Sequence, residues 1–144
     1  MNVASMAGVS GAPNMPAYAA SKAALVRFTE TLALELKEHN IQVNAVAPGF
    51  VVTRLHQQTL EAGSRAGADF LGKTREQIAQ GGVDPAIPAA LVAFLASARA
   101  DRITGKFLSS VWDDWTNFDQ HLDEIEETDV YTLRRIVPAD RGMK

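Results

Sequence analysis

The stretch Ile41-Gln-Val-Asn-Ala-Val-Ala-Pro-Gly49 decides the fold, because it comes directly after a long helical pattern. Its β-branched and small residues predict a strand over 41–47, which Pro48-Gly49 ends abruptly. Residues 17–39 have helical periodicity, and Asn40 is suited to the left-handed conformation that ends helices. A long helix that runs straight into such a strand is half of a crossover unit, which predicts the α/β class.

The helix over 17–39 carries two kinds of surface. Four large apolar residues recur at spacings of three and four and predict its buried face: Leu25, Phe28, Leu32 and Leu36. Four alanines leave part of its first turns nearly bare: Ala19, Ala20, Ala23 and Ala24. A second helix or a ligand could approach that bare side closely.

The first turns of this helix carry a pair of residues that could take part in catalysis. Tyr18 and Lys22 are four apart and would lie on one helix face. An ammonium beside a phenol stabilises the phenolate, and such a tyrosine can exchange a proton with a carbonyl or alcohol oxygen. Ser5 ends a predicted strand over 2–5, and its hydroxyl could bond the same oxygen. Taken alone, Tyr-x-x-x-Lys is common, and on most helices it is an ordinary surface pair.

The rest of the chain alternates loops and shorter elements. Residues 6–16 hold two glycines and two prolines and predict a loop. Helical pieces near 55–62 and 73–80 are interrupted by glycines, which suits either a lid over a pocket or a surface excursion. A further helix is predicted over 86–98, and residues 103–109 lead into a final strand.

The C-terminal segment differs in character. Residues 113–129 hold eight acidic residues and no Lys or Arg, with apolar residues at helical spacing, which predicts one amphipathic acidic helix. Residues 131–138 are short and basic, and we expect them to be extended. The acidic segment either packs on its own domain with a solvated face or forms a partner-binding segment.

Composition excludes several functional classes. The chain of 144 residues with a net charge of −3 predicts one domain or a piece of one, and it has no basic stripe for nucleic acid. It has no cysteine, which excludes disulfides and thiolate chemistry. No leader-like segment or membrane-spanning apolar run is visible, so we expect a cytoplasmic protein without a membrane partner.

Other catalytic patterns fail on inspection. Gly8-Val-Ser-Gly11 lacks the last glycine of a nucleophile elbow, and Gly63-x-x-x-Gly67 lacks the strand and third glycine of a phosphate loop. The three histidines stand singly, and we expect surface or cap roles for them: His39, His56 and His121. No metal site is predicted.

The motifs taken together resemble one family. Asn2-Val-Ala-Ser5, Tyr18-x-x-x-Lys22, Ile41 to Gly49 and Val51-x-Thr53 occur in this order. They resemble the C-terminal half of a short-chain dehydrogenase/reductase. Phe94-Leu-Ala-Ser97 and Ile103-Thr-Gly105 resemble the family's next helix and last strand. The resemblance covers 1–110 and implies the C-terminal part of a doubly wound, Rossmann-type parallel sheet, with 111–144 as an acidic extension on or near the same domain.

The resemblance also implies a chemistry for named residues. It makes Ser5, Tyr18 and Lys22 catalytic: Ser5 steadies the substrate oxygen, Tyr18 is the general acid or base, and Lys22 supports Tyr18 and binds the nicotinamide ribose. It makes Tyr18 and Lys22 cofactor contacts as well, and it adds four residues at and after the turn: Pro48, Gly49, Val51 and Thr53. The implied cofactor is NAD or NADP, and the implied substrate is a small carbonyl compound or secondary alcohol. Relatives commonly form homo-oligomers through the helix at 17–39 and the last strand.

One part of the family pattern has no counterpart in this sequence. The Gly-rich cofactor loop and the residues that select NAD or NADP would precede Tyr18 by far more than the 17 residues present. Two interpretations follow: an oxidoreductase of the short-chain type, or a truncated, non-catalytic fragment that self-associates or docks on a full-length relative. For the isolated chain we expect marginal folding or self-association and no measurable activity.

Overall fold

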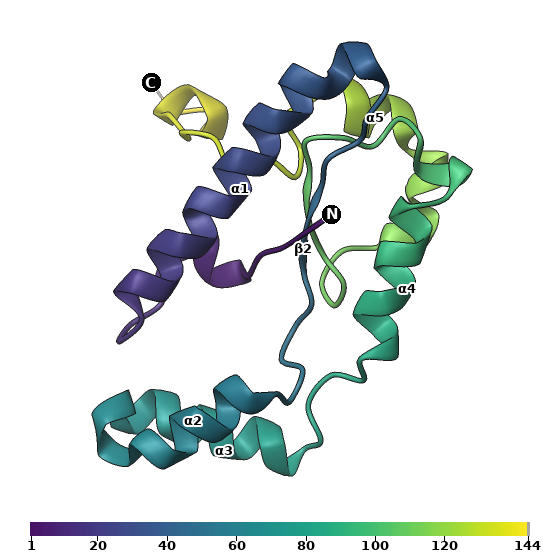
Figure 1. Cartoon of the computed structure of the whole chain (residues 1–144). Coiled ribbons are helices and arrows are strands. Elements are labelled where there is room, and N and C mark those ends of the chain that lie inside the picture. The colour runs from purple at the N-terminus through teal and green to yellow at the C-terminus, as the bar shows by residue number, and fades with distance from the viewer. Residues whose placement is uncertain (144) are drawn as a thin grey trace.

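A three-stranded parallel sheet forms the centre of the molecule. The computed structural model describes residues 1–143, and its strands are β1 (Asn2–Val3), β2 (Ala45–Ala47) and β3 (Phe107–Ser109). They lie in the order β1-β2-β3, and both pairings are parallel. Parallel strands joined through helices are the hallmark of α/β architecture, so the predicted fold class is confirmed (Figure 1).

Side-chain alternation along β2 divides the core into two layers. Ala45 and Ala47 belong to a cluster with Val26 of the helix that precedes the strand. Val46 belongs to the opposite cluster, together with Leu91 and Leu108. Successive strand residues point to opposite faces of a sheet, and here each face is covered by a different helix. All three β2 residues are therefore buried.

Helix α1 (Pro16–Leu36) joins β1 to β2. Pro16 occupies the first turn, where its missing N–H is harmless. The helix tightens into the 3-10 turn η2 (Lys37–His39) and ends at Asn40, whose φ of 54° is left-handed. The predicted helix over 17–39 and its asparagine stop are thus confirmed.

The predicted buried face of α1 is wrong in part. Phe28 is 55% exposed, and Leu25, Leu32 and Leu36 are only half-buried. The fully buried positions are instead one step away along the helix and are partly polar: Val26, Thr29, Glu30 and Ala33. The polar members have partners, since Thr29 accepts a hydrogen bond from the Asn2 side-chain amide at 2.8 Å. Polar residues can be buried on this face because they have such partners. The spacing of large apolar residues gives no sign of those positions.

The predicted strands exist but are shorter than expected. Residues 41–44 have no strand assignment, because side chains supply some of the bonds there: the Val43 N–H donates to the Thr104 hydroxyl at 3.0 Å. Ser5 lies outside β1 and instead caps the 3-10 turn η1 (Met6–Gly8) within the predicted loop. The last strand, β3, lies within the predicted segment.

Two helices form a hairpin beyond the carboxyl ends of the strands. They are α2 (Arg54–Ala62) and α3 (Ala68–Ala79), joined by the 3-10 turn η3 (Gly63–Ala66). Figure 1 shows this pair set apart from α1 and α4 at one end of the molecule. The irregular stretch of sequence therefore folds as a helical hairpin.

Helix α4 (Ala86–Leu95) covers the other face of the sheet with Leu91, Phe94 and Leu95. It ends three residues before the predicted boundary at 98. The Ser97 hydroxyl donates to the Phe94 carbonyl at 2.6 Å, and the separate 3-10 turn η4 (Ala98–Ala100) follows. A serine that competes for backbone carbonyls favours a helix end.

The acidic segment forms two short helices, so the prediction of one continuous helix is wrong. They are η5 (Trp115–Gln120) and α5 (Leu122–Glu127), separated at His121. Their apolar residues Phe118 and Ile125 are buried in the cluster that contains Leu91. Arg99 binds Asp119 at 2.6 Å, and Arg102 binds Glu126 at 2.6 Å. The acidic side chains thus pair with Arg99 and Arg102 while the apolar ones pack beneath them.

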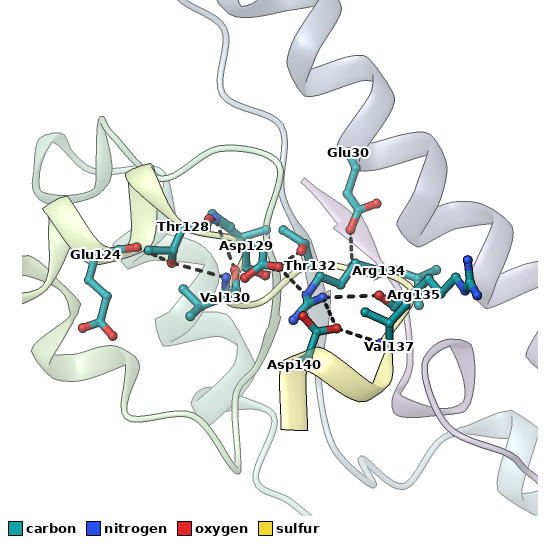
Figure 2. A network of polar contacts seen from close by, with 12 residues as sticks. Glu30, Glu124, Thr128, Asp129, Val130, Thr132, Arg134, Arg135, Val137 and Asp140 are labelled. Carbon is teal, nitrogen blue, oxygen red and sulfur yellow. Dashed lines mark hydrogen bonds and ion pairs between the residues drawn. The ribbon is translucent and has the colours of Figure 1, made fainter. Parts of the chain in front are cut away.

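Residues 128–137, here called the strap, run around β3 to α1 (Figure 2). The buried Lys106 ammonium donates to the carbonyls of Thr128 and Val130 at 2.9 and 3.1 Å. Phe107 of β3 donates its N–H to the Tyr131 carbonyl at 2.8 Å. The strap thus occupies part of the outer edge of β3.

The strap is fastened to α1 at one residue. The Leu133 N–H donates to the Glu30 carboxylate at 2.5 Å, and Arg27 binds the Leu133 carbonyl. The Leu133 side chain packs against the cluster that holds Val26. Beyond the strap the chain makes the 3-10 turn η6 (Pro138–Arg141). Among residues 1–143 no helix is long and apolar enough to cross a bilayer.

Candidate functional site

A cavity of about 750 Å³ opens where the parallel strands end. Its wall is built from η1, the first turns of α1, the segment after β2 and the α2–α3 hairpin. Ligands of open α/β sheets bind at this edge. Every residue that the sequence put forward lines this one cavity: Ser5, Tyr18, Lys22, Pro48, Gly49, Val51 and Thr53.

Tyr18 and Lys22 share a face of α1, as their spacing requires. The Lys22 ammonium lies 5.7 Å from the centroid of the Tyr18 ring. It also donates a hydrogen bond to the Val3 carbonyl at 2.9 Å, so it is held at the junction of β1 and α1. Both side chains are half-buried, which keeps a positive charge near a phenol at the cavity wall.

Ser5 is held by the turn that it begins. Its hydroxyl oxygen accepts a hydrogen bond from the Ala7 N–H at 3.2 Å. Because that bond uses an oxygen lone pair, the hydroxyl proton stays able to donate to a ligand. The turn η1 packs tightly on α1 at Gly8, where an added Cβ would lie 2.7 Å from the Lys22 carbonyl carbon. Gly8 thus sets the position of Ser5 relative to Lys22.

The segment after β2 forms the floor of the cavity. Gly49 has a φ of 78°, and an added Cβ would lie 2.6 Å from Val111. Thr53 caps α2 together with His56, whose Nδ1 accepts the Thr53 N–H at 3.1 Å. Burial lowers the pKa of His56, and its ring stands 3.9 Å from the Phe50 ring between centroids. His56 therefore has the cap role expected from the sequence.

Two contributors to the site, and one residue that holds the neighbouring sheet together, were not recognised from the sequence. Gly8 was noted only within a failed nucleophile pattern. Asn44 belongs to the quoted strand motif, yet its function as a buried bridge depends on Ile103 and Lys106, about sixty residues away. Trp112 lines the cavity from the segment after β3. The sequence signal for Asn44 was an amide between apolar residues of a predicted strand, which must find partners when buried.

No group of three or more His, Cys, Asp or Glu suited to a metal ion occurs within residues 1–143. Lys22 is the one charged side chain in the described cavity lining besides the titratable His56. The remaining lining is largely apolar, with a few hydroxyls and amides. A lining of this kind, apolar with a few convergent polar groups, is typical of small-molecule sites.

Comparison with known proteins gives a consistent result. The family model described as enoyl-(acyl carrier protein) reductase matches residues 1–110. The 3-oxoacyl-[acyl-carrier-protein] reductase FabG of Thermotoga maritima is 38% identical over 113 residues, which cover 75% of this chain and 42% of that protein.

Solved structures agree. An actinorhodin polyketide ketoreductase with NADPH is 33% identical, with a TM-score of 0.63 over 75% of this chain and 43% of that one. A 4-hydroxyisoleucine dehydrogenase with NADH is 28% identical, with a TM-score of 0.57 over 75% and 43%.

These relatives are longer than this chain, which spans about two-fifths of the reductase and of both structures. The matched residues 1–110 include the sheet, the Tyr18–Lys22 pair and the segment after β2. Homologous proteins thus bind NADH or NADPH in solved complexes. The chain belongs to the short-chain dehydrogenase/reductase family and corresponds to the C-terminal portion of its members.

Proposed function

We propose that this chain provides the substrate and nicotinamide half of a short-chain oxidoreductase site, which interconverts a carbonyl compound and a secondary alcohol. The observation that carries the proposal is the convergence of Ser5, Tyr18 and Lys22 on one cavity beside Pro48–Thr53. A nicotinamide cofactor, when bound, supplies or accepts the hydride, and NAD and NADP both remain candidates.

The roles of the three residues follow from their chemistry. In reduction, the Tyr18 hydroxyl gives its proton to the carbonyl oxygen, and in oxidation the phenolate takes a proton from the alcohol. Lys22 holds a positive charge 5.7 Å from the ring centroid, on the same helix face as the phenol that exchanges the proton. The Ser5 hydroxyl donates a hydrogen bond to the same substrate oxygen. Each role needs only the groups already at the cavity wall.

The residues present fit the nicotinamide end of the cofactor. Pro48, Gly49 and Val51 give a wall of backbone and small side chains, and Thr53 adds a hydroxyl. Lys22 is a donor suited to ribose hydroxyls. A flat, partly polar ring can lie against such a wall, and the left-handed Gly49 keeps a side chain out of the way.

A second candidate has its own supporting observation. Val3 on the edge strand β1 is 59% exposed, and Phe28 on α1 is also largely uncovered. An apolar edge and helix face favour docking with a second polypeptide, either another copy or a full-length relative. For self-association we favour α1 over β3, because the strap already binds the Phe107 N–H at the outer edge of β3.

Thermal unfolding with and without NADH or NADPH tests the proposal. A cofactor at ten times its dissociation constant should stabilise the chain by about 1.4 kcal/mol and raise the midpoint. Lys22→Met should remove that rise, whereas Lys37→Met, at an exposed position outside the cavity, should keep it. A midpoint indifferent to both cofactors would favour the non-catalytic candidate.

A further inference from the structure

Trp112 is an exposed aromatic residue at the cavity. Its side chain lines the cavity that also holds Tyr18 and Phe50, yet the residue is 67% exposed. When an apolar ligand covers a large exposed indole at the rim of an apolar cavity, the burial of both apolar surfaces stabilises the complex. The residue lies beyond the stretch 1–110 that the family model matches.

A tight turn holds Trp112 in this place. The Ser109 hydroxyl oxygen accepts the N–H groups of Val111 and Trp112 at 3.3 and 3.2 Å. The Asp113 carboxylate accepts the Ser109 N–H at 2.6 Å. Three hydrogen bonds within five residues fix the backbone on both sides of the indole. The backbone position from which the indole projects is therefore set by the fold.

The same turn is fastened to the segment after β2. The Ser110 N–H donates to the Ala47 carbonyl at 3.0 Å. Val111 packs against Gly49 so closely that a Cβ on the glycine would lie 2.6 Å from it. Trp112 thus follows directly on a contact with the Pro48-Gly49 turn. Trp112 therefore lines the same cavity as Tyr18 and the Pro48-Gly49 turn.

We propose that Trp112 is a specificity-determining residue whose indole forms the wall that packs against the apolar group of a ketone or secondary alcohol. This inference rests on the function proposed above and adds the substrate class. Charged substrates are disfavoured because the described lining has no arginine or carboxylate, and its one ammonium, that of Lys22, is assigned above to the cofactor ribose. Apolar side chains complete the wall: Met15, Phe50, Leu55 and Phe70.

The two tryptophans make the proposal directly measurable. Trp115 is the other one, and its indole N–H donates to the Ser110 carbonyl at 3.2 Å while its ring packs near Phe94. Trp115→Phe leaves Trp112 as the sole indole, and Trp112→Phe leaves Trp115. We would titrate both variants with cyclohexanol, and with 2-propanol as the small control, in the presence of NADH or NADPH.

The expected result has two parts. The emission of the Trp115→Phe variant should shift to shorter wavelength with cyclohexanol, saturably, and much less with 2-propanol, while the Trp112→Phe variant stays unchanged. By calorimetry, Trp112→Ala should bind cyclohexanol about tenfold more weakly than the wild type, since an aromatic contact and its buried area are lost. Trp112→Phe should retain most of the affinity.

The other possible results contradict the role of Trp112. They also distinguish a failure of this inference from a failure of the proposed function. If cyclohexanol binds equally to the wild type and Trp112→Ala, Trp112 does not set specificity, although the function stands. If a cofactor raises the unfolding midpoint but cyclohexanol does not bind, the apolar substrate class is wrong and the nicotinamide site stands. If neither binds, both proposals fail.

Discussion

The backbone of Lys22 leaves no room for a side chain at Gly8. An added Cβ would lie 2.7 Å from the Lys22 carbonyl carbon and 2.9 Å from its oxygen. Backbone atoms of a helix cannot yield as a flexible side chain would. The contact therefore fixes the turn that carries Ser5 against the helix that carries Tyr18 and Lys22.

Gly8→Ala should separate these two parts of the site. We expect a loss of about 1–3 kcal/mol in the free energy of unfolding, as for other overpacked contacts, together with loss of any stabilisation by NADH or NADPH. Urea unfolding with and without cofactor measures both. Gly11→Ala in the same loop is the control, since nothing lies within 4 Å of its added Cβ. Equal behaviour of the two variants would contradict this account.

Asn44 should be essential for stability. The residue is fully buried, and its side chain donates to the Ile103 carbonyl at 2.7 Å and accepts the Lys106 N–H at 3.0 Å. Asn44→Leu leaves two backbone groups without partners at roughly 1–3 kcal/mol each. Urea unfolding should show a corresponding loss in the free energy of unfolding, whereas Asn117→Ala, at an exposed site, should lower that free energy far less. A loss below that of the control would show that water or a shifted backbone satisfies both groups.

The sequence was sufficient for the fold class but not for the details of packing. Helix α1, its asparagine stop and the strand ended by Pro48-Gly49 could be predicted because each depends on neighbouring residues. The buried face of α1 could not, since Glu30 is buried by a strap that arrives from residue 133. The acidic segment was predicted as one helix because its spacing is helical, but its apolar residues pack in two short helices.

The candidate site shows the same division. Tyr18 and Lys22 were found because one helix turn brings them together. The position of Gly8 depends on its contact with Lys22, 14 residues away. That of Trp112 depends on the contact of its neighbour Val111 with Gly49, 62 residues away, and no local pattern encodes either contact. Long-range contacts of this kind need the assembled sheet.

The strap should come loose when its contact with α1 is removed. Glu30→Ala deletes the carboxylate that holds the Leu133 N–H, a charge-assisted bond for which a loss of about 1.5–3 kcal/mol is expected. Arg134 and Arg135 lie in the strap, so limited trypsin digestion should cleave there faster. Glu35→Ala, at an exposed position on the same helix, is the control. Unchanged cleavage in Glu30→Ala would mean that Lys106 and the packing of Tyr131 suffice to hold the strap.

The pH dependence of stability should carry a contribution from Asp113. Burial raises the pKa of this carboxyl, although the Ser109 N–H bond opposes the shift. Between the ordinary value of 3.8 and the raised one, the folded chain binds more protons than the unfolded chain. Its contribution to stability therefore falls as pH rises through that window. Urea midpoints across mildly acidic pH should show a flatter profile for Asp113→Asn than for the exposed control Asp101→Asn. Identical profiles would contradict the shift.

The most direct test of the half-site is a saturation-transfer NMR experiment with NADH and NADPH on the purified chain. Protons held against the protein receive saturation, so the cofactor itself reports which end is bound. Our account predicts strong transfer to the nicotinamide ring protons, weak transfer to the adenine ring protons, and loss of the nicotinamide signal in Lys22→Met but not in Lys37→Met. Transfer to adenine alone, or to neither ring, would contradict the claim that Tyr18, Lys22 and Pro48–Thr53 form the nicotinamide end of the site.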